Sequence, residues 1–299
     1  MPTNQGAIRL FRLAGIDVFL HWSWFVVALY EVQRANAYRS PFWNVAEYLA
    51  LFAIVTLHEF GHSLACRQVG GTADRVVLWP LGGVAYVDPP QRPGATLWSI
   101  AAGPLVNLVL VPVLVGLALI GRSAGLAESS PDAAAWLRAV TYINLGLLVF
   151  NLLPVYPLDG GQILRSLLWF VLGRARSLSV ASVVGFVGVL ALLALALLAG
   201  DMWLGILAVF VAMNCWRGFQ HARALARLAR LPRRPGFSCP SCRSAPPLGA
   251  LWACGQCRAP FDTFETGARC PACGAVFGET RCADCGRPSP IGEWRRAEA

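Results

Sequence analysis

The sequence has no lysine and few charged residues of any kind. All 25 basic residues are arginine, and charged residues make up only 14% of the 299-residue chain, against about 25% in a typical soluble domain. This scarcity excludes an ordinary soluble globular protein. The excess of hydrophobic residues, 56% of the whole chain, ends near residue 216. We therefore expect an integral membrane domain followed by a small soluble one.

The N-terminal apolar stretch lacks an A-x-A-like cleavage site and continues to Tyr30, which favours a first membrane helix over a cleaved signal peptide. Apolar runs of roughly 20 residues are candidate membrane helices. Six such runs lie at about 17–32, 45–66, 96–120, 138–158, 178–199 and 202–217. The run RVVLWPLGGVAYVDPP, residues 75–90, is short, β-branched and broken by proline and glycine, so it predicts a β-hairpin or a re-entrant loop.

Arginine placement predicts the orientation of the helices, because cytoplasmic loops carry the excess of positive charge. With six spans, one side of the membrane receives Arg9, Arg12, Arg67, Arg75, Arg92, Arg174, Arg176 and the six arginines between 217 and 234. We therefore expect both termini and the tail to lie in the cytoplasm.

Two histidines and a glutamate lie within the stretch VTLHEFGHSLACRQVGG, residues 55–71. Positions i and i+4 share a helix face, so His58 and His62 point the same way and match two imidazoles binding one zinc ion. Glu59 is the expected general base, which takes a proton from a zinc-bound water in the H-E-x-x-H arrangement of metalloproteases. Ionisable side chains inside a bilayer usually mark function. The alternative places the three side chains past the helix end, in interfacial water.

A third ligand is expected from FNLLPVYPLDGGQILRSL, residues 150–167. Pro154 and Pro157 break the helical hydrogen-bond ladder, and Gly160-Gly161 allow close backbone approach. An unwound segment of this kind can bring Asp159 to the metal. Two histidines, one aspartate and a water would complete a four-coordinate catalytic site.

HEFGH in a membrane helix, followed about a hundred residues later by NLLPVYPLDGG, resembles the site-2 protease family of intramembrane zinc metalloproteases (M50). The resemblance implies zinc held by His58, His62 and Asp159, with Glu59 as base, and a hairpin at Gly82-Gly83 that presents the substrate as an added strand. It also places Asn107, in AAGPLVNL, and Asn151 near the site, to bind the substrate or the developing oxyanion. Helix–helix hydrogen bonding is the alternative role for both asparagines.

Four C-x-x-C pairs lie in the tail: Cys239/Cys242, Cys254/Cys257, Cys270/Cys273 and Cys282/Cys285. Such pairs in a reducing compartment favour metal over disulfides. We expect two structural zinc sites of four thiolates each, with the first pair joined to the second and the third to the fourth. The run resembles a double zinc ribbon, and iron in rubredoxin-like sites is the alternative.

These patterns predict an α-helical polytopic membrane protein with six transmembrane helices, a small β-hairpin after the second helix and a small cytoplasmic zinc-ribbon module. The expected domains are a metalloprotease at 1–217, a basic juxtamembrane linker at 218–236 and the ribbon module at 237–299. The expected partners are membrane protein substrates, anionic lipid headgroups along the basic linker, and a protein that docks on the ribbon. A positive-inside anchor is the alternative role of the linker. Eight thiolates make the ribbon module net negative, which argues against nucleic acid.

The predicted function is intramembrane peptide-bond hydrolysis at the plasma membrane of a prokaryote. A non-catalytic membrane adaptor that recruits partners through its tail is the alternative, and an intact Glu59 argues against it. A transporter is a third hypothesis, but the sequence lacks paired half-repeats with broken helices.

Overall fold

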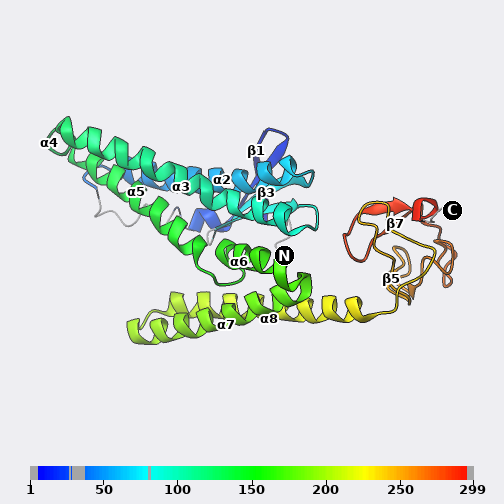
Figure 1. The fold of residues 1–299 in the computed structure, drawn as a ribbon. Coiled ribbons are helices and arrows are strands. Elements are labelled where there is room, and N and C mark those ends of the chain that lie inside the picture. The colour runs from blue at the N-terminus through cyan, green and yellow to red at the C-terminus, as the bar shows by residue number, and fades with distance from the viewer. Residues whose placement is uncertain (1–5, 27, 29–37, 80–81, 295–299) are drawn as a thin grey trace. The chain divides into compact units, whose positions relative to one another are not determined.

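A computed structural model describes the chain except residues 1–5, 27, 29–37, 80–81 and 295–299 (Figure 1). The chain divides into two compact units, Met1–Phe219 and Gln220–Ala299. The first unit combines a small sheet with long helices, and the second carries the cysteine pairs in short strands and turns.

A four-stranded sheet of order β1-β2-β3-β4 lies in the first unit. β1 (Ala7–Leu13) is antiparallel to β2 (Ile16–His21), β2 is parallel to β3 (Thr72–Trp79), and β3 is antiparallel to β4 (Gly82–Asp88). The expected hairpin is therefore present, as β3 and β4. The prediction of a membrane helix beginning at about residue 17 is wrong, because β2 covers that segment.

Side-chain burial explains why β2 is a strand. Ile16, Val18 and Leu20 are buried and alternate with less buried neighbours, which is the period of two that a sheet requires. They pack with Val76 and Leu78 of β3 in one core cluster. In an apolar stretch this alternation is easily mistaken for part of a continuous helical run. Residues 23–26 and 28 are helical, and most of the remaining predicted span, 29–32, lies outside the described residues.

Long helices make up most of the first unit. They are α2 (Pro41–Gln68), α3 (Pro93–Ser123), the short α4 (Leu126–Ser129), α5 (Pro131–Leu152), α6 (Asp159–Leu172), α7 (Arg174–Ala199) and α8 (Met202–Arg230). The last turns of α8, from Gln220 on, belong to the second unit. α2, α3 and α5 lie side by side (Figure 1). Four helical stretches among the described residues are long and apolar enough to cross a membrane: 41–68, 93–123, 131–152 and 159–199.

The chain breaks between α5 and α6. α5 ends at Leu152 rather than continuing to residue 158, and α6 begins at Asp159. The break contains the two prolines expected to interrupt the helix. A Cβ at Gly160 would clash with the backbone carbonyl of Leu152. The glycine therefore allows the start of α6 to pack closely against the end of α5. As expected, Asp159 follows an unwound segment.

Short strands and aromatic side chains build the tail. β5 (Trp252–Ala253) pairs with β6 (Pro260–Phe261), and β7 (Glu279–Arg281) pairs with β8 (Pro288–Pro290), which precedes the 3-10 helix Ile291–Trp294. Trp294 is fully buried and stacks edge-on against Phe264, with the ring centroids 4.9 Å apart.

One buried carboxylate ties several tail segments together. Oδ2 of Asp262 accepts hydrogen bonds from Arg234 Nη2 at 2.6 Å and from the Gly249 amide at 3.0 Å. Oδ1 accepts from the amide of Phe264 at 3.0 Å. The Asp262 side chain is only 5% exposed, so the loss of this carboxylate leaves buried donors without an acceptor.

Replacing Asp262 with alanine is expected to lower the free energy of unfolding of the tail by about 3–5 kcal/mol, the usual cost of breaking one side of a buried ion pair. Amide hydrogen exchange over 249–265 measures this change. Asp284→Ala is the matched control, because its ion pair with Arg233 is about one-third exposed and such pairs contribute at most about 1 kcal/mol. Equal effects of the two variants would contradict the assignment.

Candidate active site

His58, Glu59 and His62 lie in the second half of α2, and all three are buried. The helix places the two histidines one turn apart on one face. Their rings meet edge-on, with the centroids 4.8 Å apart, and their Nε2 atoms are 3.1 Å apart. Two imidazoles therefore face one point from the same helix.

Asp159 completes the cluster from a distant part of the chain. It is the first residue of α6, and its Oδ2 lies 3.0 Å from His58 Nε2 and 3.3 Å from His62 Nε2. The structure thus brings the three predicted metal ligands together, as one group whose ligand atoms all lie within 4.8 Å of one another.

The three side chains fit a zinc ion. Tetrahedral ligands bonded to zinc at about 2.0–2.1 Å lie about 3.3 Å from one another, and the three separations here are 3.0, 3.1 and 3.3 Å. The donor set of two histidines and one carboxylate is also typical of catalytic zinc, which keeps a fourth position open. His58, His62 and Asp159 would hold the ion.

Hydrogen bonds from α3 orient both imidazoles. Nδ1 of His62 lies 2.9 Å from the backbone oxygen of Ser99, and Nδ1 of His58 lies 2.6 Å from Oδ1 of Asn107. Outer hydrogen bonds of this kind fix the ring orientation of metal-binding histidines. Gly103 of α3 lets that helix approach, because a Cβ there would clash with the ring of His62.

Glu59 faces the sheet. Its Oε2 accepts a hydrogen bond from the amide of Ala85 at 2.8 Å. A Cβ at Gly83 would clash with the Glu59 side chain, so glycine at this position of β4 allows the strand to lie against the carboxylate. β4 is an edge strand of the sheet, and the hydrogen bond from the Ala85 amide shows that its outer edge faces Glu59.

The remaining predicted site residues differ in what the structure shows of them. Gly82 begins β4, and Asn151 lies partly buried in the last turn of α5. Their roles stay predictions. Asn107 is fully buried and contacts both His58 and Asn144 of α5. Sequence reasoning missed Asn144, whose only signal is a polar side chain within an apolar stretch.

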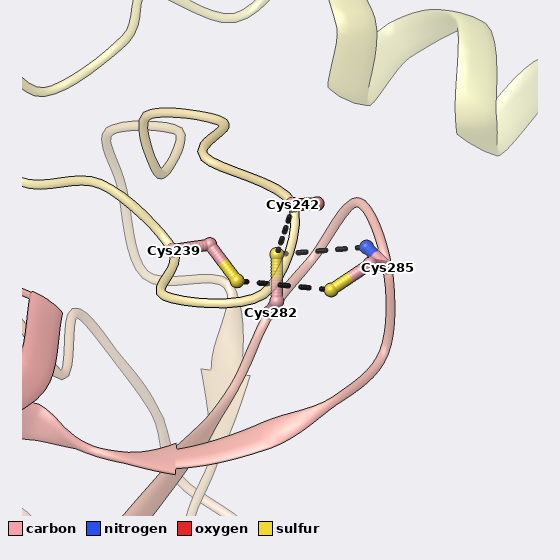
Figure 2. Close-up of side chains that lie close together, drawn as sticks. All are labelled: Cys239, Cys242, Cys282 and Cys285. Atoms are coloured by element: carbon pink, nitrogen blue, oxygen red, sulfur yellow. Dashed lines mark hydrogen bonds between the residues drawn. The ribbon is translucent and has the colours of Figure 1, made fainter. Parts of the chain in front are cut away.

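The eight tail cysteines form two groups of four, and the groups are nested rather than sequential. Cys239 and Cys242 meet Cys282 and Cys285 (Figure 2), with Sγ–Sγ distances of 3.7 Å for Cys239–Cys285 and Cys242–Cys282. The inner group contains Cys254, Cys257, Cys270 and Cys273. The expected joining of the first pair to the second and the third to the fourth is therefore wrong. Spacing alone does not determine which pairs meet.

Two thiols of the outer group lie in surroundings that disfavour the free thiolate. Burial raises the pKa of the Cys285 thiol to about 11, and burial also raises the pKa of Cys282. A bound cation reverses this preference, because a coordinating thiol is deprotonated by the metal. Each group has the four sulfurs that a tetrahedral zinc site needs.

Comparison with known proteins agrees with this geometry. The family model of Peptidase family M50 matches residues 46–135 and 120–195. Zinc metalloprotease MJ0392 of Methanocaldococcus jannaschii is 32% identical over 205 residues, which cover 69% of this chain and 58% of that protein. Putative zinc metalloprotease Rip3 of Mycobacterium tuberculosis is 31% identical over 228 residues, covering 69% of this chain and 57% of that protein. The chain thus spans somewhat more than half the length of these curated relatives.

The solved structure of the site-2 protease from Methanocaldococcus jannaschii is also similar. It aligns with a TM-score of 0.53 and 29% identity, and the alignment covers 71% of this chain and 95% of that chain. The family match at 46–195 includes most of α2 and the whole of α3, α5 and α6, the four helices that form and support the cluster. The chain belongs to Peptidase family M50, the site-2 protease family.

Proposed function

We propose that this protein is an intramembrane zinc metalloendopeptidase that hydrolyses peptide bonds in or near the transmembrane segments of membrane proteins. The convergence of His58, His62 and Asp159 beside Glu59 carries the proposal. These side chains are buried among helices long and apolar enough to cross a membrane. Burying ionisable groups in such a place costs free energy, so they usually mark a functional site.

Zinc, when bound by the three ligands, would polarise the scissile carbonyl and lower the pKa of a water toward 7. Glu59 would accept a proton from the attacking water and deliver it to the leaving amine. The hydrogen bond from Ala85 holds the Glu59 carboxylate at the edge of β4.

The outer edge of β4 is the proposed place for the substrate. A helical substrate must unwind before attack, and pairing with an exposed strand satisfies the freed backbone groups. Gly82 and Gly83 would let the added strand come close, and Asn151 would contact it. Asn107 would orient His58, because its Oδ1 lies 2.6 Å from the imidazole Nδ1, and its contact with the substrate stays a prediction.

The topology proposed has six spans with both termini in the cytoplasm: the four helical stretches given above, α8, and a first span that would begin after β2. Helix α8 extends beyond its apolar half to Arg230, and the arginines in its last turns would contact anionic lipid headgroups. The tail would hold two structural zinc ions and dock a protein partner.

Glu59→Gln is expected to retain zinc and to lower cleavage by at least about 10²–10⁴-fold, because the amide cannot act as a base. Mass spectrometry of newly formed peptide termini in membranes from cells that express each protein measures cleavage without a known substrate. Glu47→Gln, in the first half of the same helix, is the matched control and should cleave normally. Normal cleavage by Glu59→Gln would refute the base assignment.

Gly103→Ala is expected to weaken zinc binding by at least about tenfold, as loss of a supporting contact typically does, because the new methyl group displaces the His62 ring. The zinc content of each purified protein, measured at a series of buffered free-zinc concentrations, gives the change in affinity. Gly116→Ala on the same helix is the control, since a Cβ there meets no atom within 4 Å. Unchanged affinity in Gly103→Ala would contradict the proposed site.

Two crossed double variants test the nested cysteine groups. Cys242→Ser/Cys282→Ser removes two ligands of the outer group, so the chain should lose one zinc. Cys242→Ser/Cys257→Ser removes one ligand from each group, so both tail ions should bind more weakly. Metal analysis of the full chain counts the ions. Loss of one zinc from Cys242→Ser/Cys257→Ser, with weaker binding of both tail ions in Cys242→Ser/Cys282→Ser, would instead support the sequential arrangement.

A further inference from the structure

Asn144 of α5 has a fully buried side chain that lies next to the site without reaching its metal ligands. Its Oδ1 accepts a hydrogen bond from Asn107 Nδ2 at 2.8 Å, and its own Nδ2 donates to the backbone oxygen of Asn107 at 3.0 Å. Both asparagines are 0% exposed. Two hydrogen bonds thus join α5 to a single residue of α3.

The hydrogen bond from Asn144 Nδ2 to the backbone oxygen of Asn107 fixes which atoms donate and which accept in the contacts that lead to His58. A backbone carbonyl can only accept, so Asn144 must turn its Nδ2 toward the backbone oxygen of Asn107. Its Oδ1 then faces the Asn107 side chain, which must present Nδ2 to it. The Asn107 Oδ1 is thereby turned toward His58.

The orientation of Asn107 determines the tautomer of His58. Since Oδ1 of Asn107 is an acceptor, the His58 Nδ1 that lies 2.6 Å away must carry the proton. Nε2 then has a free lone pair, 3.0 Å from Asp159 and 3.1 Å from His62 Nε2. Zinc binds the unprotonated nitrogen of a neutral imidazole.

His62 is held in the same tautomer by a direct contact with the backbone. Its Nδ1 lies 2.9 Å from the carbonyl oxygen of Ser99, which cannot donate. For His62 the backbone itself dictates the proton position. For His58 the partner is a side-chain amide, which can present either an oxygen or an NH₂ group, so its direction has to be set by another residue.

We propose that Asn144 is a positioning residue that, by fixing the Asn107 amide, holds His58 in the tautomer that binds zinc. The proposal rests on the proposed zinc protease function. Without Asn144, the Asn107 amide can turn and donate to Nδ1, which leaves the proton on Nε2 and blocks the metal.

Two substitutions distinguish the positioning of Asn107 from a purely structural link between α3 and α5. Asn144→Leu keeps the approximate size and removes both hydrogen bonds. Asn144→Asp keeps an oxygen that accepts from Asn107 Nδ2, so the Asn107 orientation survives. A buried acid costs stability, so a purely structural role predicts that aspartate is the worse replacement.

Zinc affinity of the full-length protein in detergent, measured over a series of chelator-buffered zinc concentrations, is the readout. Subtracting the zinc retained by His58→Ala/His62→Ala removes the contribution of the tail. Asn144→Leu should bind about 10–100-fold more weakly, the usual effect of losing an outer-shell partner, and Asn144→Asp should lose less than about tenfold. Thermal unfolding of each variant is recorded in parallel.

Asn214→Leu is the matched control. Within the described part of the chain the Asn214 amide donates only to the Phe210 carbonyl of its own helix α8, so the zinc affinity of this variant should equal that of the wild type. Wild-type affinity in Asn144→Leu, or weaker binding in Asn144→Asp than in Asn144→Leu, overturns the positioning role alone. If the wild type holds no more zinc than His58→Ala/His62→Ala, the proposed function fails and the role of Asn144 fails with it.

Discussion

Two imidazole nitrogens and a carboxylate oxygen meet within 3.3 Å of one another in the buried part of the first unit. Three electron-rich atoms repel each other at this distance unless a cation lies between them. The arrangement depends on α2 and α6 being held together against that repulsion. The hydrogen bonds from α3 and the close approach at Gly103 and Gly160 supply the restraint.

Several glycines therefore have one common purpose. Gly103 makes room for His62, Gly83 makes room for Glu59, and Gly160 lets the chain return to the end of α5. In each case the missing side chain allows a functional group or a backbone segment to come closer than any other residue permits. The site is assembled by close contact of helices and an edge strand rather than by loops alone.

The sequence predicted the parts of the site that are local or follow a helix period. HEFGH specifies two histidines on one face whatever surrounds it, and the prolines after Asn151 predicted the break before Asp159. β2 was missed because a strand buried on its inner face and a membrane helix are both apolar. The role of Asn144 depends on contacts between α3 and α5, and no local pattern marks such a contact.

The nested cysteine groups have a consequence for the order in which the tail assembles. The inner group joins residues as little as 13 positions apart, whereas Cys242 and Cys282 of the outer group are 40 positions apart. Shorter loops cost less entropy to close, and all four inner cysteines leave the ribosome before Cys282. The inner group can therefore assemble during synthesis, before the segment that carries Cys282 and Cys285 joins the outer group.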